Sequence, residues 1–123
     1  MNSDLVTILL TNMPSERTLQ TRIDRIKRAL LALGDLRPGT LSKQYNVCGN
    51  PKCRCKAEPP RKHGPYYQLS FTRKGRSRTE FIRTENLPSV RTQIRNYDKL
   101  RKLIDEWLDL SIELDRLRRS TNR

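Results

Sequence analysis

A first apolar pattern lies between positions 14 and 33. Its members follow one another at intervals of four, three, four and three residues, which is the spacing of one face of an α-helix. They are Leu19, Ile23, Ile26, Leu30 and Leu33. Asn12 or Ser15 can cap the start of this helix, and Gly34 can end it. The pattern therefore predicts a helix from about residue 14 to residue 33.

A second helical pattern is longer, beginning near Pro88 and reaching about Arg119. Alternating intervals of three and four give it a seam like that of a coiled coil. The seam consists of Leu100, Leu103, Trp107, Leu110, Leu114 and Leu117. Beside it lies a second apolar row of Val90, Ile94, Tyr97, Ile104 and Leu108. Such a helix needs more than one neighbour. The first helix can be one neighbour, as the other arm of an antiparallel pair. A second copy of the protein, or another protein, can be the next neighbour.

Between the helices, residues 65–72 and 77–83 have the composition of two strands joined by a basic connection, RKGR. A two-residue turn at positions 74 and 75 would place Leu69 opposite Glu80, which gives a poorly apolar face. A three-residue loop over 73–75 instead pairs Tyr67 with Phe81 and Leu69 with Thr79. We expect the second register. It leaves three cations at the hairpin tip and Arg78 on the opposite face.

Together these elements predict an α+β fold. A β-hairpin module over residues 37–86 lies between an N-terminal helix within 1–36 and a long, coiled-coil-like helix within 87–123, all in one compact domain. The segment DLRPGT at 35–40 is the expected boundary after the first helix, because proline and glycine interrupt the helical pattern. For residues 1–11 the sequence does not decide between strand pairing, packing and fraying.

Charge is distributed unevenly along the chain. The formal net charge is +13. Residues 37–83 hold twelve Lys/Arg and two Asp/Glu, whereas residues 1–36 hold five and four, and residues 84–123 hold nine and seven. An excess concentrated in one segment is typical of a surface that meets a polyanion. The alternative is a basic face that serves only solvation.

The chain carries no recognisable export or membrane signal. Asp4 precedes the short apolar run LVTILL, and no basic segment leads that run. No stretch approaches the roughly 20 apolar residues that a membrane-spanning helix needs. We therefore expect a cytoplasmic protein without membrane partners, in a compartment where thiols stay reduced.

All three cysteines and the only histidine lie within one short, basic segment rich in glycine and proline. Cys48, Cys53, Cys55 and His63 form the pattern C-x4-C-x-C-x7-H, and three thiolates with one imidazole complete the closed tetrahedral shell of a structural zinc ion. The sequence therefore predicts bound Zn²⁺, which would help a chain with little apolar material to fold. Ordinary thiols with a loop histidine, or a redox-sensing cluster, are the alternatives.

The motifs RPGTL, CGNPKCRC, HGPYYQLSF and KGRSRT, followed by a helix with RNYDKLRKLIDEWLDL, resemble a family of short, uncharacterised bacterial proteins often linked to mobile elements or transposases. The resemblance covers roughly residues 37–117 and leaves out the first helix. Its pattern is CGxxxCxC…HGPY, a basic hairpin and a helical tail. It implies a setting among mobile DNA and supplies no activity.

We expect a nucleic-acid-binding accessory protein, with DNA a more probable target than RNA because of this resemblance. Cations would contact phosphates, and Tyr66 would stack on an unpaired base, with Tyr45 a weaker stacking candidate. The predicted contacts are Lys52, Arg54, Lys56, Arg61, Lys62, Tyr66, Arg73, Lys74, Arg76 and Arg78. Tyr67 and Phe71 share a face with Leu69 and are expected in the core.

The alternative is a protein–protein adaptor whose helical seam docks on a transposase-like enzyme or on a second copy. Catalysis is not expected, because the single histidine is better explained as a metal ligand than as a base. The acidic side chains near the C-terminus, Asp105, Glu106, Asp109 and Glu113, have the helical spacing of a solvated face.

Overall fold

A computed structural model describes residues 14–121 of the chain. The alternative helix cap at Asn12 and the apolar run of residues 5–10 lie outside the described residues. The chain divides into two compact units. The helix-pair unit contains residues up to 33 and from 99 onward, and the sheet unit contains residues 34–98. No helix in the described part of the chain is long and apolar enough to cross a membrane.

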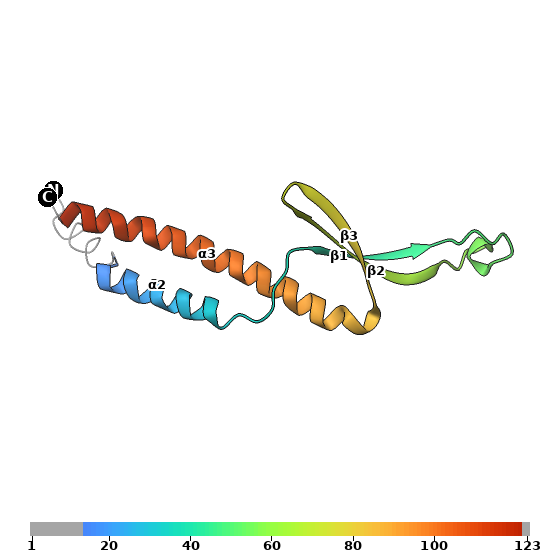
Figure 1. Ribbon diagram of the computed structural model, residues 1–123, viewed down its shortest axis with the longest axis horizontal. Helices are drawn as coiled ribbons and strands as arrows, with labels where there is room; N and C mark the ends of the chain where they lie inside the picture. Colours follow the sequence, from blue (N-terminus) through green and yellow to red (C-terminus); the bar gives the residue numbers. More distant parts are fainter. Residues whose placement is uncertain (1–13, 122–123) are drawn as a thin grey trace, which may run out of the picture. The chain divides into compact units, whose positions relative to one another are not determined.

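The two predicted helices are present. Helix α2 spans Glu16–Leu31 and helix α3 spans Leu87–Thr121 (Figure 1). Ser15 caps α2, because its side-chain oxygen accepts a hydrogen bond from the Thr18 amide at 3.1 Å. Helix α2 ends three residues before Gly34, where the Ala32 amide donates to the Arg28 carbonyl.

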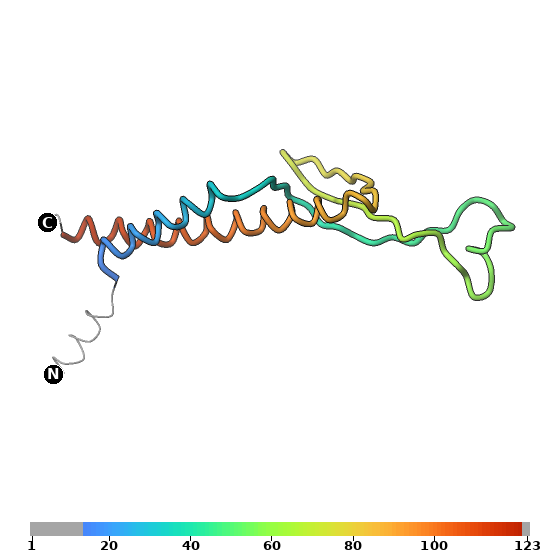
Figure 2. Tube along the Cα trace, turned by 90° about the horizontal axis from the view of Figure 1, so that it is seen from below, coloured from blue at the N-terminus to red at the C-terminus, as the bar shows by residue number. Residues whose placement is uncertain are grey.

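In the helix-pair unit, α2 lies alongside the C-terminal part of α3 in the opposite direction (Figures 1 and 2). The Arg118 side chain donates to Gln20 at 3.2 Å, and Thr121 donates to Glu16 at 3.5 Å. The buried core of this pair consists of Leu19, Ile23, Ile26, Leu110 and Leu114, with Leu30, Leu103, Trp107 and Leu117 packed against it. The predicted antiparallel pair is confirmed. Most of the predicted seam is therefore covered by α2 of the same chain.

The sheet unit contains a three-stranded antiparallel sheet in the order β1-β2-β3 (Figure 1). Strand β1 spans Thr40–Asn46, β2 spans His63–Arg73 and β3 spans Arg76–Ile82. Short 3-10 helices occupy Arg54–Lys56 and Thr84–Asn86. The α+β class with a hairpin between two helices is confirmed, and β1 is an additional strand that the sequence analysis did not predict.

The expected register of the β2–β3 hairpin is wrong. The turn has two residues, Lys74 and Gly75, with φ of 52° and 74°, the positive values that a type I′ turn requires. Leu69 consequently pairs with Glu80, and Phe71 with Arg78. The apolar partner of Leu69 comes from the other side, where β1 places Leu41 opposite it. The sequence-based prediction did not include β1, so the face that pairs Leu69 with Glu80 had too few apolar residues in it.

One face of the sheet is covered within the sheet unit, and we call it the covered face. Leu69 on this face is completely buried. The Arg37 guanidinium lies 5.0 Å from the Phe71 ring centroid and forms a 3.2 Å ion pair with Glu80. The Arg37 amide in turn donates to the Gln93 carbonyl of α3. The segment after α2 and the first turns of α3 thus hold the covered face.

Gly39, the last residue before β1, lies directly against the buried Leu69 side chain. Its φ is +147°, and a Cβ atom there would lie 2.5 Å from Leu69 Cδ1. We expect Gly39→Ala to lower the free energy of unfolding by roughly 1 to 3 kcal/mol, the usual cost of backbone strain at one residue. Urea denaturation measures this. Gly49→Ala is the matched control, because no atom lies within 4 Å of the Cβ that it adds; equal losses in both variants would contradict the assignment.

The helix pair offers a second matched comparison. Leu114 is 4% exposed and belongs to the core between α2 and α3, whereas Leu108 on the same helix is 56% exposed. We expect Leu114→Ala to lower the free energy of unfolding by about 2 to 5 kcal/mol and Leu108→Ala by about 0.5 kcal/mol or less. Thermal unfolding followed by circular dichroism decides. A larger loss for Leu108→Ala would show that the helices pair through a different face.

Candidate metal centre and basic hairpin

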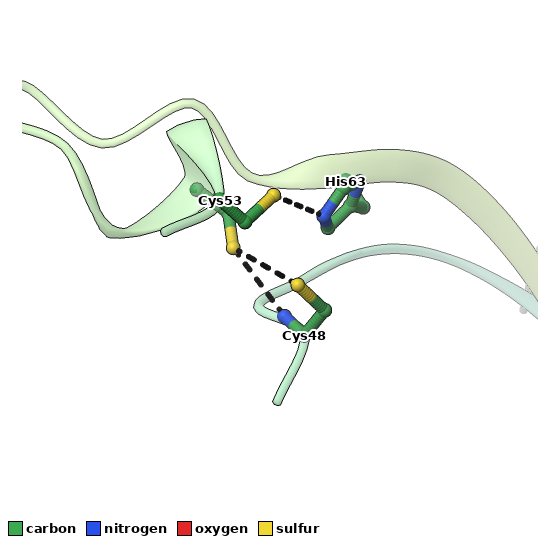
Figure 3. A group of neighbouring side chains, drawn as sticks. Cys48, Cys53 and His63 are labelled. Atoms are coloured by element: carbon green, nitrogen blue, oxygen red, sulfur yellow. Dashed lines mark hydrogen bonds between the residues drawn. The ribbon is translucent and has the colours of Figure 1, made fainter. Parts of the chain in front are cut away.

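The four predicted metal ligands converge. Cys48 lies two residues beyond the end of β1, Cys53 and Cys55 flank the start of the 3-10 helix, and His63 opens β2. Their ligand atoms all lie within 4.8 Å of one another. Figure 3 shows the Cys53 and His63 side chains pointing toward each other, with His63 Nε2 3.1 Å from Cys53 Sγ. This cluster can hold a metal ion.

The chain between β1 and β2 forms a loop (Figure 2), and local hydrogen bonds shape this loop around the four ligands. Asn50 organises the first turn: its side-chain oxygen accepts from the Lys52 amide at 3.0 Å and its carbonyl accepts from the Cys53 amide at 3.2 Å. Farther on, the Arg61 amide donates to the Arg54 carbonyl at 3.1 Å. Gly64 allows β2 to approach β1, since a Cβ there would lie 2.7 Å from the Gln44 carbonyl oxygen. The backbone itself therefore brings the four side chains together.

The donor set fits a tetrahedral zinc ion. Two thiolates on one such ion, each about 2.3 Å from it, lie roughly 3.8 Å apart, and Cys48 Sγ and Cys55 Sγ are 3.7 Å apart. This separation is far beyond the roughly 2.05 Å of a disulfide bond, and all three cysteines are free. Three thiolates and an imidazole fill four coordination positions, which is typical of structural rather than catalytic zinc.

The three thiols differ in their electrostatic surroundings. A hydrogen bond from the Cys55 backbone amide, with smaller contributions from Cys48, Cys55 and His63 side chains, lowers the pKa of Cys53 to about 6. The Cys48 amide donates to Cys55 Sγ at 3.4 Å and favours its thiolate, but burial and the neighbouring sulfurs outweigh this bond and raise the pKa of Cys55. Burial beside other sulfurs disfavours the thiolate form of a cysteine, and a bound cation offsets this cost by neutralising the negative charge.

The predicted phosphate contacts fall into two groups at opposite ends of β2. Lys52, Arg54, Lys56, Arg61 and Lys62 are exposed on the loop that carries the metal ligands. The second group surrounds the β2–β3 turn and consists of Arg73, Lys74, Arg76 and Arg78. Because β2 runs from His63 to Arg73, ten residue steps of about 3.3 Å separate its ends by roughly 33 Å. The two groups cannot contact the same phosphate.

The second group converges on one groove, which we call the arginine groove. It is a shallow depression of about 440 Å³ lined by Phe71, Arg73, Lys74, Arg76 and Arg78. The expectation that Arg78 lies on the opposite face is wrong, because the two-residue turn pairs Arg73 with Arg76 and Phe71 with Arg78 and so places all three arginines on one face. Within residues 14–121, none of these four cations forms an ion pair with a carboxylate.

The aromatic residues of the sheet divide between its faces. Tyr67 and Phe71 share the face of Leu69, as expected, but they are half-buried and do not belong to the buried core. Tyr66 is exposed and forms an edge-to-face pair with Phe81, their ring centroids 6.0 Å apart. The expected register paired Phe81 with Tyr67, whereas in the structure Phe81 pairs with Gln68. Once the turn is known to have two residues, the alternation of side chains along β3 places Phe81 on the same face as Tyr66. Tyr45 is also exposed, and its hydroxyl raises the pKa of Lys43 by hydrogen bonding.

No curated protein and no solved structure matches this chain. A family of domains of unknown function, DUF6788, matches residues 16–92, which is 77 of the 123 residues. The match includes α2, so the first helix, which the resemblance drawn from the sequence left out, is part of the matched domain. It also includes all four metal ligands, the complete sheet and the arginine groove. The chain therefore belongs to this family, the domain of unknown function DUF6788.

Proposed function

We propose that this protein binds nucleic acid, DNA in preference to RNA, through the sheet unit, and that a structural Zn²⁺ ion held by Cys48, Cys53, Cys55 and His63 orders the loop beside it. One observation carries the proposal. Four cations surround a single groove, and none of them forms an ion pair with a carboxylate of the described chain. The resemblance to proteins of mobile elements favours DNA.

The arginine groove has the chemistry of a phosphate site. Guanidinium groups bind phosphate oxygens through two parallel hydrogen bonds, and a lysine adds a point charge. Repulsion among four neighbouring cations lowers the stability of the free hairpin, and a polyanion removes that repulsion when it binds. Released counterions add to the binding free energy and make it steeply dependent on salt.

Zinc would act on the other basic group. The ion links the end of β1, the 3-10 helix and the first residue of β2, so it fixes the loop whose five exposed cations are otherwise held only by turn hydrogen bonds. The thiolates offset the charge of the ion, which leaves these cations available for phosphate. With the two groups roughly 33 Å apart, a nucleic acid that contacts both extends along β2.

Metal content tests the zinc assignment. We expect one Zn²⁺ per chain by native mass spectrometry, and loss of the metal in Cys55→Ser, which removes the buried ligand. Chelation should increase hydrogen exchange across residues 47–63 and leave the α2–α3 pair protected. Lys52→Ala is the control, because it alters the same loop without removing a ligand. A protein purified without metal, with the loop already protected, would rule out the structural role.

Salt-dependent binding tests the groove. In the double variant Arg73→Ala/Arg76→Ala we expect weaker binding to a 20-nucleotide DNA. The slope of log K against log salt should become shallower by about 1.4 on single strands and about 1.8 on duplex. Fluorescence anisotropy at several salt concentrations measures both quantities.

The matched control for this variant is Arg22→Ala/Arg25→Ala, which removes the same charge from exposed positions on α2. We expect its salt slope to stay within error of wild type. Equal effects of the two double variants would mean that net charge alone attracts the DNA, and the arginine groove would then have no specific role.

A protein-docking function is the second candidate. Its support comes from α3, where Ile104, Leu108 and Ile112 follow one another at intervals of four residues and are 39%, 56% and 54% exposed. The predicted seam is largely covered by α2, so a second copy or a transposase-like partner would dock on this row. This function is compatible with nucleic-acid binding, since the row belongs to the other unit of the chain.

A further inference from the structure

Within the described strands β1, β2 and β3, the second face of the sheet carries no charged side chain, although charged residues make up 32% of the chain. Strand alternation and the observed pairing place ten residues there. We call it the uncharged face. It consists of Thr40, Ser42, Gln44, Tyr66, Gln68, Ser70, Thr72, Ser77, Thr79 and Phe81. All are hydroxyl, amide or aromatic residues.

Side-chain contacts across the strands confirm that these residues share one face. Ser70 Oγ lies 3.3 Å from Thr79 Oγ1, and Thr72 Oγ1 lies 3.0 Å from Ser77 Oγ. On the β1 side, the Gln44 amide donates to Ser42 Oγ at 3.2 Å. The face therefore presents a field of neutral hydrogen-bonding groups with both donor and acceptor capacity.

An aromatic pair lies within this field. Tyr66 and Phe81 pack edge to face, and they are 37% and 66% exposed. An exposed phenylalanine that contacts another exposed ring leaves much of its apolar surface in water, which is unfavourable in the free protein. Aromatic rings beside neutral donors and acceptors match the two surfaces of a nucleobase, its flat π-face and its hydrogen-bonding edge.

We propose that the uncharged face binds unpaired bases, with Tyr66 and Phe81 as the stacking residues, so that the nucleic acid bound by this protein is single-stranded. This inference rests on the proposed function, since the arginine groove supplies the attraction for phosphate. It adds the class of nucleic acid, which neither the family nor the basic groove determines.

The position of the two sites favours a single strand over a duplex. The arginine groove lies on the covered face, because Phe71, Arg73 and Arg78 alternate with residues of the uncharged face along β2 and β3. Strand β3 is an edge of the sheet. A nucleic acid that contacts both the arginine groove and the uncharged face must bend around the edge formed by β3. A duplex, with a persistence length of about 150 base pairs, resists such bending, and its bases are already paired and stacked.

Binding of matched oligonucleotides tests the inference. The probes are a 20-nucleotide mixed-sequence DNA and the duplex formed with its complement. We expect the wild-type protein to prefer the single strand, and the variant Tyr66→Ala/Phe81→Ala to bind it about ten- to a hundredfold more weakly. Its salt slope should remain that of wild type, because no phosphate contact is lost.

Leu36→Ala is the control. It also removes exposed apolar surface from the sheet unit, but Leu36 lies outside the uncharged face, and we expect near-wild-type affinity. A second measurement does not depend on a variant: ultraviolet cross-linking to DNA carrying 5-bromodeoxyuridine, followed by peptide mapping, should identify residue 66 or 81. Circular dichroism of each variant verifies that the sheet is intact.

The outcomes separate the two proposals. If neither probe binds at low salt, the proposed nucleic-acid function itself fails. If binding occurs and depends on the arginine groove, but the duplex is preferred or Tyr66→Ala/Phe81→Ala binds the single strand like wild type, only the stacking inference is overturned. Cross-links confined to the loop of residues 47–62 would overturn it as well.

Discussion

The pairing of β2 with a neighbour on each side determines where every candidate group in the sheet unit lies. At its first residue, β2 places His63 opposite Asn46 of β1, two residues before the first cysteine. At its last residue it places Arg73 opposite Arg76. A shift of one residue in the β2–β3 pairing would move the side chains of β3 to the other face, which would remove Arg78 from the groove and turn Phe81 toward the covered face. The two-residue turn therefore determines both the composition of the arginine groove and the exposure of Phe81.

The sheet unit has little apolar core to enforce this arrangement. Within the described chain its buried apolar residues are Leu69, Leu87 and Val90, together with the thiol of Cys55. Cys55 is also the only buried residue of the loop between β1 and β2. Hydrogen bonds within turns cannot by themselves offset the conformational entropy lost when such a loop becomes ordered. The proposed metal ion, held by one ligand from each end of the loop and two from its middle, would supply the missing cross-link, which would explain why the donors gather there.

Sequence reasoning worked where one periodic signal acts alone. Leu19, Ile23 and Ile26 predicted α2 and its buried face, and Ser15 was one of the two candidate caps. The ligand set followed from residue type and spacing, because no other histidine or cysteine competes with it. The sheet was harder. Strand β1, with Ser42, Lys43 and Gln44 at its centre, carries too few apolar residues to reveal itself. Without it, the pairing of Leu69 with Glu80 looked unfavourable and the wrong register was chosen.

The tip of the β2–β3 hairpin carries a lysine in a strained backbone conformation, which lowers the stability of the fold. Lys74 adopts φ of 52°, where a residue other than glycine, asparagine or aspartate is strained by about 1 kcal/mol or more. Asparagine in the same place would relieve the strain and remove one positive charge. Instead, a strained lysine stands among three arginines around one groove. The two costs are the backbone strain at Lys74 and the repulsion among the four cations. A sheet with few buried residues has little stability from which to offset them. Both costs would be offset by the anionic partner proposed above, because a polyanion neutralises these cations when it binds.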